Sequence, residues 1–178
     1  MGAGGAARGA LVTAGGADAT AGGADAPGGH HVSDLFDISG RTALVTGGSR
    51  GIGLMIARGF VEAGAKVYIS SRKAEVCDEV AAELSKVGTC ISVPADVATE
   101  ADCNALAARV AEDTERLHIL VNNAGATWGA PLAEYPDSAW DKLYATNVKA
   151  PFFLTRALLP QLESAATAPA VGAPEERL

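Results

Sequence analysis

The sequence contains no apolar run that approaches the roughly 20 residues of a membrane-spanning helix, so no membrane partner is expected. It is also poor in basic residues, with 14 Lys and Arg against 21 Asp and Glu and a net charge of −7. Nucleic-acid binding depends on clustered Lys and Arg, and this balance therefore argues against a nucleic-acid partner. The 48% hydrophobic content argues against disorder in the central part of the chain.

Cysteine is scarce, and Cys77, Cys90 and Cys103 form no C-x-x-C pair and have no His nearby. A zinc site needs four ligands, usually in close pairs, so no metal site is predicted. We expect three reduced thiols, buried or half-buried, as is usual for a cytoplasmic protein. The N-terminal segment lacks the basic start and apolar stretch of a secretory signal, which favours the same location.

The two ends of the chain differ in composition from the centre. The first thirty residues hold ten Gly and ten Ala, and the heptapeptide TAGGADA occurs there twice in succession. Such residues bury too little surface to offset the entropy of ordering, so residues 1–34 are expected to form a disordered tail. Pro169 and Pro174 predict a second, irregular tail at 165–178, which leaves 35–164 as the foldable domain.

Apolar runs alternate with helical patterns through this domain. The apolar runs predict buried strands at 42–46, 66–70, 89–93 and 118–122. Helices are expected over 51–63, 74–87, 99–116 and 137–163, the last one bent at Pro151. Strands that alternate with helices form βαβ units, so the predicted fold class is α/β with a doubly wound parallel sheet. Ligands of such sheets bind at the carboxyl ends of the strands.

A glycine-rich loop joins the first strand to the first helix. Gly47, Gly51 and Gly53 allow a tight turn and let the backbone approach a ligand closely. The helix that follows offers free N–H groups and the positive end of its dipole to a pyrophosphate. The G-x-x-x-G-x-G spacing differs from the common G-x-G-x-x-G fingerprint. The context nevertheless favours dinucleotide binding, with a purely structural turn as the alternative.

Three residues near this loop indicate which dinucleotide is bound. An NAD site usually has an acid about 20 residues after the glycines, where it holds the ribose 2′-hydroxyl. Here Ser71 stands in that place and Arg72 follows it, while Arg50 lies within the loop. A carboxylate would repel a 2′-phosphate, whereas a guanidinium pairs with it, so NADP(H) is favoured over NAD(H). The alternative is that both arginines are ordinary surface charges.

Taken together, these segments resemble the classical short-chain dehydrogenases/reductases. The resemblance covers roughly residues 35–163 and rests on four motifs in the family's order: TGGSRGIG at 46–53, ADV at 95–97, NNAG at 122–125 and TNV at 146–148. It implies a Rossmann fold and a carbonyl substrate of small size. The residues that the loop argument and the resemblance together assign to cofactor binding are Gly47, Ser49, Arg50, Gly51, Ile52, Gly53, Ser71, Arg72, Asp96, Val97, Asn123, Ala124 and Gly125.

The resemblance also implies individual roles. Asp96 would accept a hydrogen bond from the adenine amino group, and Asn147 would be the helix asparagine of the catalytic tetrad, which holds a water in a proton relay. For Asn147 alone, a polar residue that bends a helix is the alternative. The segment 122–136 further resembles a bacterial branch that includes NADPH-dependent 3-oxoacyl reductases, which implies a 3-oxoacyl thioester substrate. Trp128 would then line the substrate side of the site, or serve only in packing.

The remaining tetrad members are missing from the sequence. The family's reaction needs a Ser and a Tyr-x-x-x-Lys pair, in which the Lys lowers the pKa of the Tyr. Tyr68, Tyr135 and Tyr144 have no Lys four residues later, and no Ser follows Ser164. We therefore expect a Rossmann domain truncated after about four strands and the long fourth helix, which binds its cofactor but is inactive as written.

A truncated sheet implies surfaces that lack their usual cover. We expect an unpaired sheet edge and exposed apolar residues, namely Phe152, Phe153, Leu154, Leu158, Leu159 and Leu162. Such surfaces favour self-association through the long helix at 137–163. Two alternatives to a reductase part stay open: a non-catalytic dinucleotide-binding module, and a fragment that associates with a full-length relative.

Overall fold

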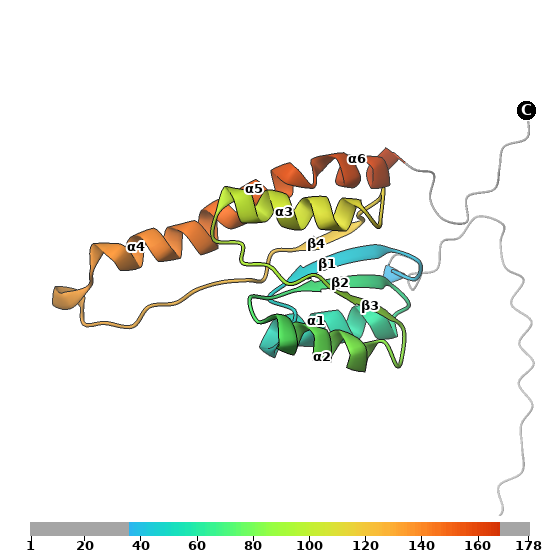
Figure 1. Cartoon of the computed structure of the whole chain (residues 1–178), viewed down its shortest axis with the longest axis horizontal. Helices are drawn as coiled ribbons and strands as arrows, with labels where there is room; N and C mark the ends of the chain where they lie inside the picture. Colours follow the sequence, from blue (N-terminus) through green and yellow to red (C-terminus); the bar gives the residue numbers. More distant parts are fainter. Residues whose placement is uncertain (1–35, 168–178) are drawn as a thin grey trace, which may run out of the picture. The chain divides into compact units, whose positions relative to one another are not determined.

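The computed structural model describes residues 36–167, so the tail predicted at 1–34 and residues 168–178 of the tail predicted at 165–178 lie outside the described residues. Four parallel strands form one sheet in the order β3-β2-β1-β4 (Figure 1). They are β1 (Thr42–Thr46), β2 (Lys66–Ser70), β3 (Thr89–Ser92) and β4 (Ile119–Val121). All four lie within one residue of the predicted runs, and the doubly wound α/β fold class is confirmed.

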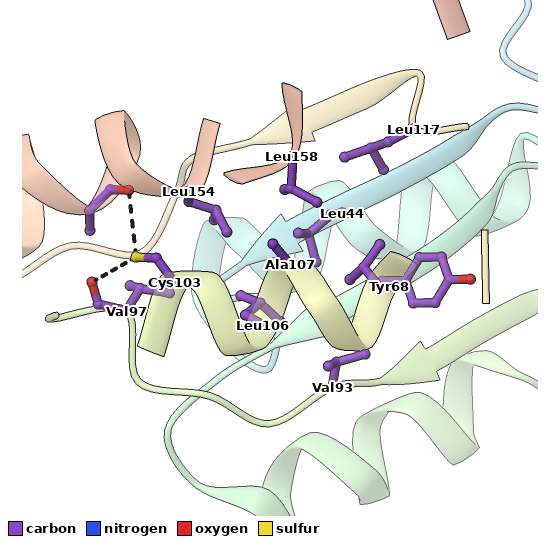
Figure 2. Packing of buried hydrophobic residues seen from close by; sticks show 12 residues of the cluster. Leu44, Tyr68, Val93, Val97, Cys103, Leu106, Ala107, Leu117, Leu154 and Leu158 are labelled. Carbon is purple, nitrogen blue, oxygen red and sulfur yellow. Dashed lines mark hydrogen bonds between the residues drawn. The ribbon is translucent and has the colours of Figure 1, made fainter. Parts of the chain in front are cut away.

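Helices cover both faces of the sheet (Figure 1). The helices α1 (Gly51–Glu62) and α2 (Ala74–Leu84) lie on one face, and α3 (Glu100–Ala111), α5 (Ala150–Ala157) and α6 (Leu159–Thr167) lie on the other. Successive side chains of a strand point to opposite faces. Val45 therefore packs in the layer of α1 and α2, whereas Leu44 packs in the layer of α3 and α5 (Figure 2). Two buried faces explain why the strands are apolar throughout.

The predicted long helix is interrupted twice, first by a π-helical turn directly before Pro151, where a bend was expected, and again at Leu158. The helix α4 (Asp137–Tyr144) leads into the π-helical turn, η3 (Ala145–Lys149), then α5, and the helix breaks at Leu158 before α6 begins. Proline at 151 has no N–H to donate to the carbonyl of Asn147, and the wider π turn directly before it accommodates this loss. The later break has the same cause, because Pro160 cannot donate to the carbonyl of Arg156.

Several predicted boundaries and exposures need correction. The helices predicted to end at 87 and 116 end at Leu84 and Ala111. The C-terminal helix continues to Thr167, beyond the expected end of the domain at 164, because the next helix-breaking residue is Pro169. Of the apolar residues expected to lack cover, Leu154 and Leu158 are in fact buried against α3 and the sheet, Phe153 and Leu162 are half-buried, and Phe152 and Leu159 are exposed.

The three cysteines are buried and free, as predicted. Burial raises the pKa of the Cys90 thiol to about 11, so it stays protonated at neutral pH. The Cys103 thiol donates to the carbonyls of Val97, at 3.4 Å, and Ala150, at 3.8 Å (Figure 2). These thiols therefore serve packing rather than chemistry. Among residues 36–167, no helix combines the length and apolar character needed to cross a membrane.

Candidate functional site

The glycine loop lies at the carboxyl end of β1, where it turns directly into α1. Gly47 and Gly51 have left-handed backbone angles, with φ of 67° and 54°, which favour glycine over any other residue. Gly53 is required for a different reason, because a Cβ there would lie 2.3 Å from the carbonyl oxygen of Gly47. A Cβ on Gly47 would in turn lie 2.8 Å from Nδ2 of Asn123. The glycine loop, the start of α1 and the segment after β4 thus pack so closely that no side chain fits at Gly47 or Gly53.

The first turn of α1 is open to an anionic ligand. Arg50, the residue before the helix, is extended and makes no side-chain capping bond, and no acidic side chain lies in the first turn. A Cβ on Gly51 would meet no atom within 4 Å, so the space in front of this turn is free. Ile52 is 70% exposed, whereas Ser49 is buried. Uncapped N–H groups at the positive end of a helix dipole fit a pyrophosphate.

The hydroxyl of Thr46 joins the glycine loop to the segment after β4. It donates to the carbonyl of Val121, at 3.1 Å, and accepts from the amides of Asn123 and Ala124, both at 3.0 Å. In the other direction, the Asn123 carboxamide donates to the carbonyls of Thr46, at 2.9 Å, and Gly47, at 3.4 Å. This role of Thr46 was not predicted from the sequence, although Thr46 is the last residue of β1 and directly precedes Gly47.

The carboxamide of Asn147 fixes the next residues of the same segment. Its Oδ1 accepts from the amide of Ala126, at 2.9 Å, and its Nδ2 donates to the Ala126 carbonyl, at 3.0 Å. A Cβ on Gly125 would lie 3.3 Å from that Oδ1, so the glycine gives the carboxamide room. Asn147 lies in the π turn η3, and short π segments often occur at functional sites.

The ends of β2 and β3 complete this edge of the sheet. The amide of Ala95 donates to the carbonyl of Ser71, at 3.1 Å, which brings the two strand ends together. Arg72 is exposed beside them. Asp96 is exposed and uses Oδ1 to accept from the amide of Ala98, at 3.1 Å, which leaves Oδ2 for a ligand. The side chain of Val97 is buried in the core, so a ligand contact there would use its backbone.

The fold thus places all of the predicted site residues at one edge. They lie in the segments that directly follow the carboxyl ends of β1, β2, β3 and β4, or, for Asn147, bonded to the last of these segments. Trp128 lies further along the last segment, 40% exposed, with the Lys142 ammonium 5.3 Å from the centre of its ring. This cation–π pair, which brings α4 against the loop, was not predicted from the sequence. Within the described residues, no group of three or more His, Cys, Asp or Glu side chains is arranged to hold a metal.

Comparison with known proteins gives a consistent result. A family model described as short chain dehydrogenase matches residues 41–171. The chain is 51% identical over 133 residues to a Pseudomonas aeruginosa rhamnolipids biosynthesis 3-oxoacyl-[acyl-carrier-protein] reductase, covering 75% of this chain and 52% of that protein. It is 41% identical over 127 residues to gluconate 5-dehydrogenase of Gluconobacter oxydans, covering 70% and 49%. The chain therefore spans about half the length of the curated relatives it matches.

A solved structure shows the same likeness. An NADP active-site complex from Pseudomonas aeruginosa aligns with a TM-score of 0.72 and 51% identity, over 75% of this chain and 52% of that one.

Proposed function

The chain belongs to the short-chain dehydrogenase/reductase family, and on that premise we propose that it is the NADP(H)-binding part of an oxidoreductase that reduces a carbonyl to an alcohol. The observation that carries the proposal is the uncapped first turn of α1, which faces free space at Gly51. The N–H groups of this turn would hold the pyrophosphate. The relatives' NADP complex supports the same assignment.

Charge supports the phosphorylated cofactor over NAD(H). Arg50 and Arg72 are both exposed near the carboxyl ends of the strands, and neither makes an ion pair within residues 36–167. We assign them to the 2′-phosphate, which a guanidinium binds in two-pronged fashion. Ser71 stands where an acid would otherwise repel that phosphate.

The remaining contacts follow from the other strand ends. Asp96 has a free Oδ2 that would accept from the adenine amino group. Ala124, held by Thr46, and Gly125, next to the Ala126 that Asn147 holds, would pass close to the nicotinamide. When bound, the nicotinamide supplies the hydride for the carbonyl carbon. The backbone carbonyl of Asn147, which Pro151 leaves without an α-helical donor, is the group assigned to hold a water for proton transfer.

For the complete enzyme we propose a 3-oxoacyl thioester as substrate, on the strength of the 51% identity to a 3-oxoacyl reductase. The 178 residues contain no Tyr-x-x-x-Lys, so we expect them to bind NADPH without reducing such a substrate. The buried free thiols support a cytoplasmic location. A purely binding module is the alternative, and it makes the same prediction for this chain.

Calorimetric titration of the chain with NADPH and NADH tests the proposal. NADPH should bind more tightly than NADH, and Arg72→Gln should weaken NADPH binding by about ten-fold while leaving NADH unchanged. Arg58→Gln removes an exposed charge at a different place, on α1, and serves as the matched control. Equal affinities for the two cofactors, or equal losses in the two variants, would refute the role of Arg72.

An exposed apolar stripe favours a second proposal, that two copies associate through these helices. α4 continues in line with α5 beyond the carboxyl ends of the strands (Figure 1). Trp140, Tyr144, Val148 and Phe152 recur every four residues there and are 65%, 54%, 50% and 62% exposed. The stripe is symmetric about residue 146. An antiparallel pair of copies would therefore place Trp140 against Phe152 and Tyr144 against Val148.

Charge agrees with the antiparallel arrangement. In this register Asp141 falls opposite position 151 of the partner copy, two residues from that copy's Lys149, so the two opposite charges lie near one another across the pair. Asp141→Lys should weaken association, and adding Lys149→Asp should restore it, as measured by sedimentation equilibrium. A monomeric wild-type chain at all concentrations would exclude this interface. Co-purification with a full-length relative alone would instead favour the fragment alternative.

A further inference from the structure

A pocket lies at the opposite end of the strands from the glycine loop. Its volume is about 250 Å³, and we call it the basal groove; it is lined by Ile38, Arg41, His118, Ile119, Leu162, Ala165 and Ala166. These residues come from the segment before β1, the start of β4 and the second half of α6. Drug-sized ligands occupy roughly 300–1,000 Å³, so the basal groove suits a smaller molecule.

Arg41 brings a positive charge to this groove. It is half-buried, and its guanidinium makes no hydrogen bond or ion pair with any residue from 36 to 167. The hydrogen bonds of Ser39, and to a smaller extent the charge of Arg41, lower the pKa of the nearby Asp37 carboxyl, but its hydrogen bonds go to the Ser39 amide, at 2.8 Å, and hydroxyl, at 3.0 Å, and not to Arg41. The Arg41 backbone is fixed, since its amide donates to Ile38 and its carbonyl accepts from Lys66. The guanidinium is therefore available to a ligand.

His118 supplies a second donor. Its Nδ1 accepts from the amide of Thr42, at 3.0 Å, and its own amide donates to the Thr42 carbonyl, at 2.9 Å. A neutral imidazole that accepts through one nitrogen carries its proton on the other, so Nε2 is a hydrogen-bond donor. Burial, followed by the charges of Arg41 and Arg116, lowers the pKa of His118 and keeps the ring neutral at pH 7.

The lining therefore combines a cation, a neutral donor and an apolar floor. The other five lining residues are aliphatic, and no side chain in the lining is a carboxylate. Such a surface recognises an anion that carries a hydrocarbon tail, because the head is paired and the tail is removed from water. We propose that the basal groove binds a short-chain monocarboxylate, with its head on Arg41 and His118 Nε2–H and its tail against Leu162.

The probe is hexanoate, added to the full chain labelled with ¹³C-histidine and observed by NMR at the imidazole of His118. Assignment uses His118→Gln, since His30 and His31 are the other histidines. Hexanoate should shift the His118 signal saturably. Hexanol, which has the tail without the charge, and inorganic phosphate, which has the charge without the tail, should each bind at least about ten-fold more weakly.

A variant separates the charge of Arg41 from general anion effects. Arg41→Gln should weaken hexanoate about ten-fold or more, whereas Arg58→Gln on α1 should leave it unchanged. NADPH should not displace hexanoate, because the two sites lie at opposite ends of the strands. Equal shifts from hexanoate and hexanol, or from hexanoate and phosphate, would overturn the proposal. A His118 signal that does not shift with hexanoate would also overturn it. If that signal instead shifts when Glu175 and Glu176 are changed to Gln, the groove binds the chain's own last residues.

Discussion

The side chain of Asn147 pairs with the backbone of Ala126 as a neighbouring strand would. It accepts from the Ala126 amide, at 2.9 Å, and donates to the Ala126 carbonyl, at 3.0 Å. The π turn of η3 presents this carboxamide, while the glycine at 125 leaves room for it. One residue of a helix thus fixes the loop that follows β4, beside the glycine loop. In this account Asn147 has a positioning role that is separate from any use of its backbone carbonyl.

Replacing Asn147 tests this pairing. Asn147→Asp keeps the acceptor and loses the donor, so it should cost about 0.5–1.5 kcal/mol in the free energy of unfolding, and Asn147→Leu should cost about twice as much. Urea denaturation measures both. Asn104→Asp, at an exposed position of α3, is the control and should change stability little. Equal effects of the Asp and Leu variants would contradict a two-bond contact.

Gly53 and Gly59 lie on the same helix and should respond oppositely to alanine. A Cβ at Gly53 would lie 2.3 Å from the Gly47 carbonyl oxygen, so Gly53→Ala must displace the loop and abolish NADPH binding. A Cβ at Gly59 meets nothing within 4 Å, so Gly59→Ala should stabilise the helix by about 0.5–1 kcal/mol and leave binding intact. Thermal unfolding and NADPH titration of both variants provide the measurement. Normal NADPH affinity in Gly53→Ala would show that the loop is looser than described.

The Thr46 hydroxyl should be needed for stability. Thr46 is buried and accepts from two backbone amides, so Thr46→Val leaves the N–H of Ala124 without a partner, while the N–H of Asn123 keeps the carbonyl of Val121. An unsatisfied buried donor costs about 1–3 kcal/mol, and Thr46→Val should lose stability within that range. Thr46→Ser keeps the hydroxyl and should lose less. A valine variant as stable as the serine variant would mean that water replaces the hydroxyl.

The sequence predicted the strands well because each is buried on both faces and bounded by turn residues. The run at 42–46, for example, is followed by Gly47, which adopts a φ of 67°. The common edge of the predicted site residues also followed, since ligands of a parallel sheet bind where its strands end. These features depend on local pattern and on topology, both of which the sequence carries.

The interruptions of the helix at 137–163 were harder to predict. A proline at 151 permits a kink, but nothing local predicts a π turn directly before it, in which Asn147 contacts Ala126, 21 residues away. Burial of Leu154 and Leu158 was missed because it depends on how α5 packs against α3 and the sheet. The Trp128–Lys142 pair is likewise a contact between a loop and a helix. Pairings of this kind have no signature in local sequence.

His118 should make stability depend on pH. Burial lowers its pKa below the usual 6.5, and the ring accepts from the Thr42 amide only when neutral. The unfolded chain therefore binds the proton more readily, and the stabilisation is present above pH 6.5 and is lost as the pH falls below it. Urea titrations from pH 7.5 to 5 should show this loss in the wild type, and His118→Gln should remove the His118 contribution while leaving other acid-linked losses. Identical pH profiles for the two proteins would exclude this role for His118.

The most direct test of the account follows the backbone amides of α1 by NMR while NADP⁺ is added. The amides of Gly51, Ile52 and Gly53 should shift most, because the pyrophosphate lies on the uncapped first turn. NAD⁺ should move the same signals but saturate at a higher concentration. Shifts that cluster away from this turn, or none with either cofactor, would contradict the cofactor site described here.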